Sequence, residues 1–83
     1  MGITIAALEL EWSTTQAQAE RFELEMNARG FVKDGGHKWI AHTAFRDERA
    51  ATRAVRSAAA ASSVAIAAAA YGPRLPQTGS ASG

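Results

Sequence analysis

A row of arginines spaced three and four residues apart is the feature of this sequence with the clearest chemistry. The arginine row consists of Arg46, Arg49, Arg53 and Arg56. On an α-helix, which turns about 100° per residue, the four side chains fall within a sector about 80° wide. Guanidinium groups arranged in this way can contact successive phosphates of a nucleic acid or the carboxylates of an acidic protein surface. The row therefore predicts a binding helix, and Lys38 and His42 are candidates to extend its basic surface.

The arginine row has a second interpretation, in which acidic side chains of the same chain neutralise it. The net charge is only +1, but the two signs are separated along the sequence. Residues 1–28 hold five carboxylates and a single arginine, whereas residues 29–74 hold eight basic and three acidic residues. The acidic half, together with Asp47 and Glu48, can pair with the row inside the molecule. The same separation favours head-to-tail contact between copies of the chain.

His37 is the candidate for catalysis. It follows Gly35-Gly36, where the backbone can approach a substrate closely. With Gly30-Phe31 it resembles the HicA-type toxin ribonucleases, in which a helix ending in Gly-Phe leads into a strand and then into a Gly-X-His element. The likeness covers the stretch from Gly30 to His37, and the strand within it is shorter than in that family. It implies that His37 is a general base or acid for RNA cleavage; the residues alone also fit a surface turn histidine without a role.

Other kinds of catalytic site find little support in the sequence. The chain has no cysteine, which excludes disulfides and thiolate zinc sites. His37 and His42 are five residues apart on an expected strand, so their side chains point to opposite faces. No glycine loop has the spacing that cradles a phosphate, and no serine has a partner motif for nucleophilic attack. We therefore expect a non-enzymatic protein with no metal and no cofactor.

The N-terminal residues predict a strand. Leu8, Leu10 and Trp12 alternate with glutamates, which is the period of a half-buried strand. The alternation changes phase after Ile5, and this predicts a β-bulge near Ala6-Ala7. A helical interpretation of the same stretch stays open.

A helix is expected next, from an N-cap at Ser13 to Arg29. Gln16 would complete a capping box with Ser13, and Gly30 is the residue type that commonly follows a helix end. The predicted core-facing side of this helix holds Ala19, Phe22 and Met26.

A β-hairpin follows the first helix. Phe31–Lys33 and residues 37–45 have strand patterns, and Asp34-Gly35-Gly36 between them is a strong signal for a tight turn. On the longer strand Trp39 and Phe45 share one face, and we place both in the core.

The second helix begins near residues 46–47 and has two possible ends. Gly72-Pro73 is a strong stop signal, which supports one helix as far as Tyr71. On that helix, however, apolar residues beyond position 63 would lie on the arginine side. A break after Ser62-Ser63 would remove this conflict and free residues 64–71 as a last strand.

The expected fold is therefore a small α+β domain over residues 1–71. Without the last strand, two helices cover a three-stranded sheet; with it, the order of elements is that of the ferredoxin-like plan. Residues 72–83 are rich in Gly, Pro and Ser and are expected to form a disordered tail. Within the tail, Leu75–Gly79 resembles the sorting pentapeptide of cell-wall-anchored surface proteins. The segments that accompany it in that family are missing here, so we expect an added tag or a coincidence.

These patterns favour a small binding protein that presents its arginine-striped helix to nucleic acid or to an acidic protein, for example as an inhibitor or adaptor of a nucleoprotein machine. Two alternatives are an RNA-cleaving toxin built around His37, and a structural subunit that forms homo-oligomers through its alanine-rich segment. The sequence shows neither an export signal nor a long apolar span. We therefore expect a cytoplasmic protein without a membrane partner.

Overall fold

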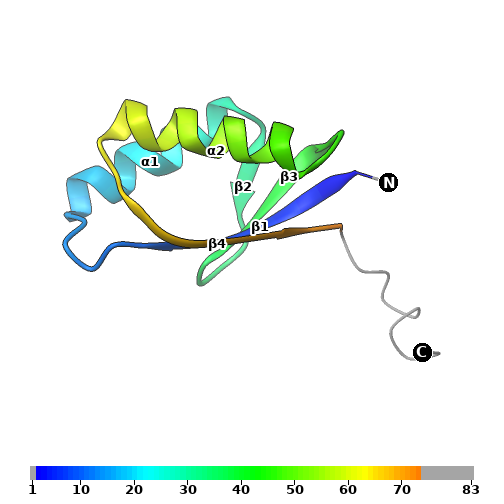
Figure 1. Ribbon diagram of the computed structural model, residues 1–83. Helices are drawn as coiled ribbons and strands as arrows, with labels where there is room; N and C mark the ends of the chain where they lie inside the picture. Colours follow the sequence, from blue (N-terminus) through cyan, green and yellow to red (C-terminus); the bar gives the residue numbers. More distant parts are fainter. Residues whose placement is uncertain (1, 74–83) are drawn as a thin grey trace.

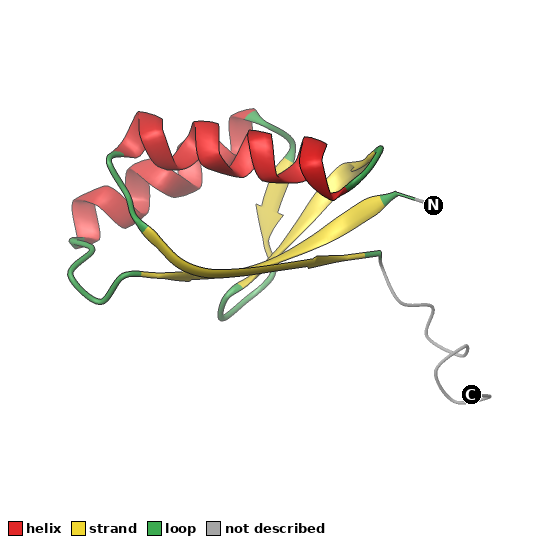
Figure 2. Cartoon of the chain, in the orientation of Figure 1, coloured by secondary structure: helices red, strands yellow, loops and turns green. Residues whose placement is uncertain are grey.

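The computed structural model, which describes residues 2–73, has two helices on one face of a four-stranded sheet (Figures 1 and 2). The elements in chain order are β1 (Ile3–Leu10), α1 (Gln16–Ala28), β2 (Phe31–Lys33), β3 (Lys38–Phe45), α2 (Glu48–Ser62) and β4 (Ile66–Gly72). The strand order is β2-β3-β1-β4, and every neighbouring pair is antiparallel. The predicted α+β fold is confirmed, and the order of elements is that of the ferredoxin-like alternative.

Strand β1 has the predicted alternation from Ala6 to Leu10. Ala6 and Leu8 are buried, whereas Ala7 and Glu9 are exposed. The predicted bulge at Ala6-Ala7 was wrong, because the irregularities of pairing lie towards the two ends of the strand. One lies between residues 3 and 5 against β3, and the other between residues 9 and 10 against β4. The residues before Ala6 are only half-buried, so they do not need to keep the phase of the core-facing residues.

The alternation does not continue to Trp12. Strand β1 ends at Leu10, and the chain then turns, with the Thr14 N–H donating to the Glu11 carbonyl over 3.0 Å. Trp12 lies on this turn with 93% of its surface exposed, so it does not belong to the core.

Helix α1 begins two residues later than expected, because Thr15 and not Ser13 is its N-cap. The Thr15 hydroxyl accepts from the Gln18 N–H over 3.1 Å, and the Gln18 side-chain oxygen accepts from the Thr15 N–H over 2.9 Å. Thr15 with Gln18 fits a capping box by residue type, as does the expected pair of Ser13 and Gln16. The Thr15 box has the further advantage that the Gln18 amide also donates to the Ser63 carbonyl, over 2.8 Å, at the far end of α2.

The end of α1 and the following hairpin match the sequence prediction. Gly30, after the last helical turn, has a φ of 92°, and Gly35 and Gly36 in the hairpin turn also have positive φ values. These conformations favour glycine because they crowd a Cβ atom.

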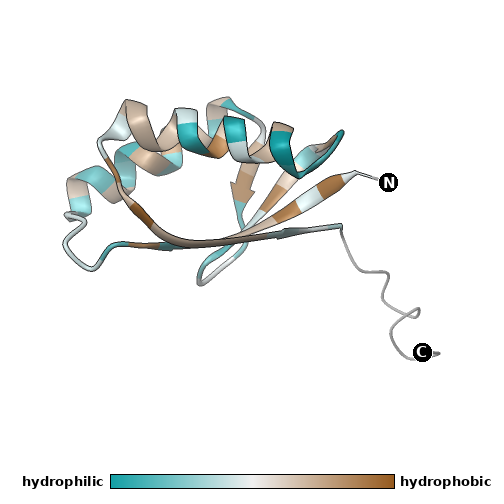
Figure 3. Cartoon of the chain, viewed as in Figure 1, coloured by the Kyte–Doolittle hydropathy of each residue, from teal (hydrophilic) through white to brown (hydrophobic). Residues whose placement is uncertain are grey.

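The core lies between the sheet and the two helices. Phe22 of α1 contacts Trp39 of β3 edge to face, with 5.6 Å between ring centroids, and Phe31 stacks on Phe45 at 5.2 Å. Phe22, Phe31 and Trp39 are buried, whereas Phe45 is half-buried at the margin of the core. Apolar residues accordingly concentrate on the sheet, and the outer side of α2 is hydrophilic (Figure 3).

Helix α2 ends at Ser62 with Ser63 as its C-cap, so the alternative of one helix as far as Tyr71 was wrong. Ser63 adopts the left-handed conformation, with φ 59° and ψ 37°. The Val64 N–H then bonds back to the Ala59 carbonyl over 2.9 Å, which closes the helix. Val64 becomes buried, and the chain pairs with β1 as β4. The three-stranded alternative is therefore also wrong.

Strand β4 ends at Gly72, one residue beyond the expected domain limit at residue 71. The remainder of the expected tail, with the pentapeptide Leu75–Gly79, lies outside the described residues.

The left-handed conformation of Ser63 yields a test of the helix end. Glycine adopts this conformation without a steric penalty, so Ser63→Gly should raise the free energy of unfolding by up to about 1 kcal/mol. The matched control is Ala60→Gly, at an exposed position inside α2, which should lower it by about 1 kcal/mol. Urea unfolding followed by circular dichroism measures both, and a loss of stability in Ser63→Gly would contradict the assigned helix end.

Candidate functional site

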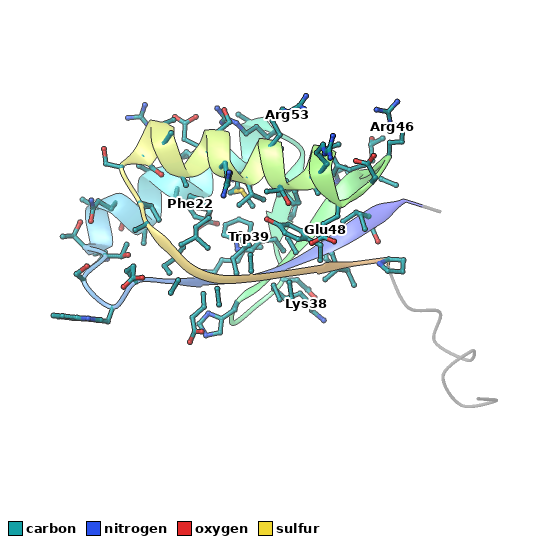
Figure 4. All side chains as sticks on the ribbon, in the orientation of Figure 1. Phe22, Lys38, Trp39, Arg46, Glu48 and Arg53 are labelled. Carbon is teal, nitrogen blue, oxygen red and sulfur yellow. The ribbon has the colours of Figure 1, made fainter. Side chains whose placement is uncertain are left out.

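Helix α2 separates the predicted basic side from an apolar side. Arg49, Arg53 and Arg56, referred to here as the α2 arginines, are exposed. The buried residues of the helix are Ala51, Val55, Ala58, Ala59 and Ser62. A rise of 1.5 Å per residue places the first and last arginine about 10 Å apart along the helix axis. In Figure 4, Arg53 points away from the sheet.

Arg46 is not part of the helical row. Asp47 is the N-cap of α2, and its carboxylate accepts from the Ala50 N–H over 2.9 Å. An aspartate at this position satisfies a free helical N–H and suits the positive end of the helix dipole. Arg46 therefore precedes the helix, and its guanidinium lies 3.9 Å from the Asp47 carboxylate.

Acidic side chains do not neutralise the α2 arginines. Within residues 2–73, no carboxylate lies within 4.0 Å of the guanidinium of Arg49, Arg53 or Arg56. The closest acidic residue in the sequence, Glu48, lies towards the sheet in Figure 4, whereas Arg53 points away from it. The interpretation of the row as an internally paired face therefore finds no support in these contacts.

Among the described residues, the acidic half of the chain forms ion pairs through Glu25 alone, with arginines close to it in sequence. The Glu25 carboxylate accepts from both Arg21 and Arg29, each over 2.8 Å. Hydrogen bonds, first from Arg29 and then from Arg21, lower the pKa of Glu25 below its ordinary value of 4.5. Arg29 also donates to the Ser57 hydroxyl of α2 over 3.0 Å, which joins the two helices.

A shallow depression of about 560 Å³ lies beside the α2 arginines. It is lined by Glu48, Arg49, Thr52, Arg53 and Arg56. Ser57, which contacts α1 through Arg29, is not part of this lining. The depression is therefore open to solvent on the part of α2 that does not contact α1, where an extended anionic surface has access to all three guanidinium groups.

Lys38 and His42 lie away from the α2 arginines. On β3 they alternate with Trp39 and Ala41, which are buried under the helices. Because successive strand residues point to opposite faces, Lys38 and His42 belong to the helix-free face of the sheet. Figure 4 shows Lys38 on one side of the sheet and Arg53 on the other. The predicted basic surface thus divides into two separate parts, and Lys38 is bound in an ion pair with Asp34 at 3.4 Å.

His37 is exposed in the loop between β2 and β3. Its carbonyl accepts from the Leu8 N–H over 2.8 Å, which fixes the loop against β1. Together with Glu9 it lines a depression of about 260 Å³, which also includes alanines of β4. The sequence analysis did not identify Glu9 as a neighbour, because it comes from a different strand and its alternation indicated only an exposed position. Among the described residues no three His, Asp or Glu side chains are grouped as a metal site would require.

Comparisons of this chain with protein families, with curated proteins and with solved structures give no match. The HicA-type likeness therefore rests on the residues from Gly30 to His37 alone. Neither helix within residues 2–73 has the length and apolar character needed to cross a membrane.

The paired state of Glu25 predicts a pH dependence of stability. A carboxylate whose folded-state pKa is lowered stabilises the fold above its unfolded-state pKa, and this contribution disappears as the pH falls through the lowered value. Glu25→Gln should therefore unfold at lower urea concentration than the wild type at pH 7, and the difference should disappear in acid. Glu23→Gln, on the same helix and outside the ion pairs, is the control and should show no such difference. An equal effect of both substitutions would contradict the assignment.

Proposed function

We propose that this chain is a small non-enzymatic binding protein that presents the α2 arginines to an anionic partner, either nucleic acid or an acidic protein surface. The observation that carries the proposal is that the three guanidinium groups are exposed and, within residues 2–73, form no ion pair. By contrast, Arg21, Arg29, Lys38 and Arg46 each have an acidic partner. A binding partner is therefore the expected source of charge neutralisation for the α2 arginines.

The packing of α2 against the sheet holds these arginines in positions that favour binding. Val55, Ala58 and Ala51 are fully buried on the other side of α2, so the helix has a fixed orientation on the sheet. Guanidinium groups held on a rigid element lose less conformational entropy when they bind than those on a mobile loop. Their planar donors match the oxygen geometry of phosphates and carboxylates.

Among nucleic acids, the phosphate backbone of a duplex is the favoured ligand. Single strands are usually bound by aromatic side chains that stack on the bases, together with basic residues. The depression at α2 has no aromatic residue in its lining. Contacts to phosphates carry no sequence information, so we expect binding with little sequence preference. A protein of this size would act as an inhibitor or adaptor, by occupying a surface of a larger nucleoprotein machine.

The test is titration of short fluorescent DNA and RNA duplexes over a series of salt concentrations, with the wild type and with Arg53→Gln/Arg56→Gln. The double variant should bind about thirtyfold more weakly, because each lost contact costs on the order of 1 kcal/mol. The slope of log affinity against log salt should fall by about 2.

The matched control is Lys33→Gln/Lys38→Gln, which removes the same charge from other elements and should retain wild-type affinity. Equal weakening by both double variants would show that net charge, and not the α2 arginines, determines binding. Binding to polyglutamate but to neither duplex would identify an acidic protein as the partner. Absence of binding to all three probes at low salt would overturn the proposal.

RNA cleavage is the second candidate function, and the shared depression of His37 and Glu9 favours it. A histidine and a carboxylate that face one space are the groups that general acid–base catalysis requires. If this candidate is right, the wild type degrades RNA and His37→Ala does not, whereas the control His42→Ala, on the helix-free face, degrades RNA like the wild type. Intact RNA with the wild type would exclude this function.

A further inference from the structure

Strand β4 leaves one of its two edges open. It is the last strand of the order β2-β3-β1-β4, and it pairs with β1 alone. Among the described residues, its outer edge has no backbone partner. Such an edge is a template for a further strand, and natural proteins usually block it with charges, prolines, bulges or a short length.

The two edges of this sheet differ in how well they are protected against pairing with a further strand. The opposite edge is formed by β2, which has only three residues and ends in Lys33. Strand β4 has seven residues, with neither a charge nor a proline among them. Its irregularity of pairing lies at the Ile66 end, so most of the strand is regular.

The helices do not cover the middle of β4. Ala67, Ala68, Ala69 and Ala70 are all exposed, although successive residues point to opposite faces. In β1 next to it, Ala6 and Leu8 are fully or almost fully buried. Helix α2 contacts β4, but it leaves these four alanines exposed, so β4 presents methyl groups on both faces along its free edge.

The distribution of charge indicates which partner fits this edge. No charged residue occurs between Arg56 and Arg74. A two-fold contact between copies brings each surface against itself. A two-fold contact at the outer side of α2 would place the arginines of the two copies against each other. A two-fold contact at the outer side of α1 would do the same with exposed carboxylates such as Glu20 and Glu23. The residues of β4 carry no charge, so pairing at this edge brings no charged strand residues of the two copies together.

We propose that β4 pairs antiparallel with β4 of a second copy, forming a dimer with a continuous eight-stranded sheet. Antiparallel pairing about Ala69 places Ala69 opposite its own copy and Ala68 opposite Ala70, so methyl groups meet at the centre, while Ala67 lies opposite Tyr71. A strand with larger side chains would gain no such match. The assembly closes at two copies, because each outer edge is then the short β2 strand with its lysine.

The dimer has a consequence for the arrangement of helices. Antiparallel pairing of identical edge strands places the two-fold axis perpendicular to the sheet, so the helices of both copies lie on the same face. Helix α2 covers the half of the sheet next to β4, and the two α2 helices therefore flank the axis (Figure 1).

The experiment is sedimentation velocity of the full chain over a range of concentrations, without nucleic acid. The wild-type mass should approach twice the 8.7 kDa of the chain as concentration rises. Ala70→Lys, which adds a charge at an exposed position of the edge, should remain at the mass of one chain. Ala28→Lys, at an exposed position of α1, is the matched control and should form the dimer like the wild type.

A second measurement does not depend on a variant. In amide hydrogen exchange of the wild type, the β4 amides that point outwards should become protected as concentration rises, while those of β2 should not change. A single-chain mass at millimolar concentration, a dimer of Ala70→Lys, or growth beyond two copies would each overturn the proposal. These outcomes are independent of nucleic-acid binding, so failure of the α2 arginines to bind an anion would leave them unaffected.

Discussion

The left-handed conformation of Ser63 is the local constraint on which the architecture depends. The seventeen residues from Ser57 to Pro73 are uncharged and mostly alanine, so their intrinsic preference is for helix over their whole length. Ser63 stops α2 and directs the chain back along β1. If the helix continued, β1 would lose its partner on one side, and Val64 would lose its buried position. The bond from Gln18 to the Ser63 carbonyl connects this turn to the start of α1.

Small residues on α2 allow it to lie close to the sheet and to α1. Ala51 and Ala58 are completely buried, and a larger side chain at either position would separate the layers. The same packing explains why the arginines face outwards, since a helix with one buried side has one direction left for charged residues. Glu25 meanwhile binds Arg21 and Arg29, so it does not pair with the α2 arginines. Separation of charge along the sequence thus results in local pairing within α1 and not in pairing across the molecule.

The two proposed surfaces of this protein use different physical properties. The α2 arginines attract an anion through charge, which acts at a distance and weakens with salt. The β4 edge has no charge and relies on backbone hydrogen bonds and flat methyl surfaces, which act only on contact. Both lie on the same half of the molecule, because α2 covers the part of the sheet next to β4. A dimer through β4 would therefore enlarge the anion-binding surface without covering it.

Local patterns in the sequence were sufficient to predict several elements of the fold. Period-two alternation identified the face of β3 that holds Trp39, glycines marked the turns with positive φ, and the spacing of Arg49, Arg53 and Arg56 identified one side of a helix. Other features were decided by tertiary contacts. The capping box lies at Thr15 and not at the expected Ser13, and its Gln18 also contacts Ser63 at the far end of α2. Lys38 and His42 are basic, but only the position of the helices shows that they face away from α2. The choice between helix and strand after Ser63 belongs to this second group, because alanine by itself favours helix and only pairing with β1 makes the strand the better state.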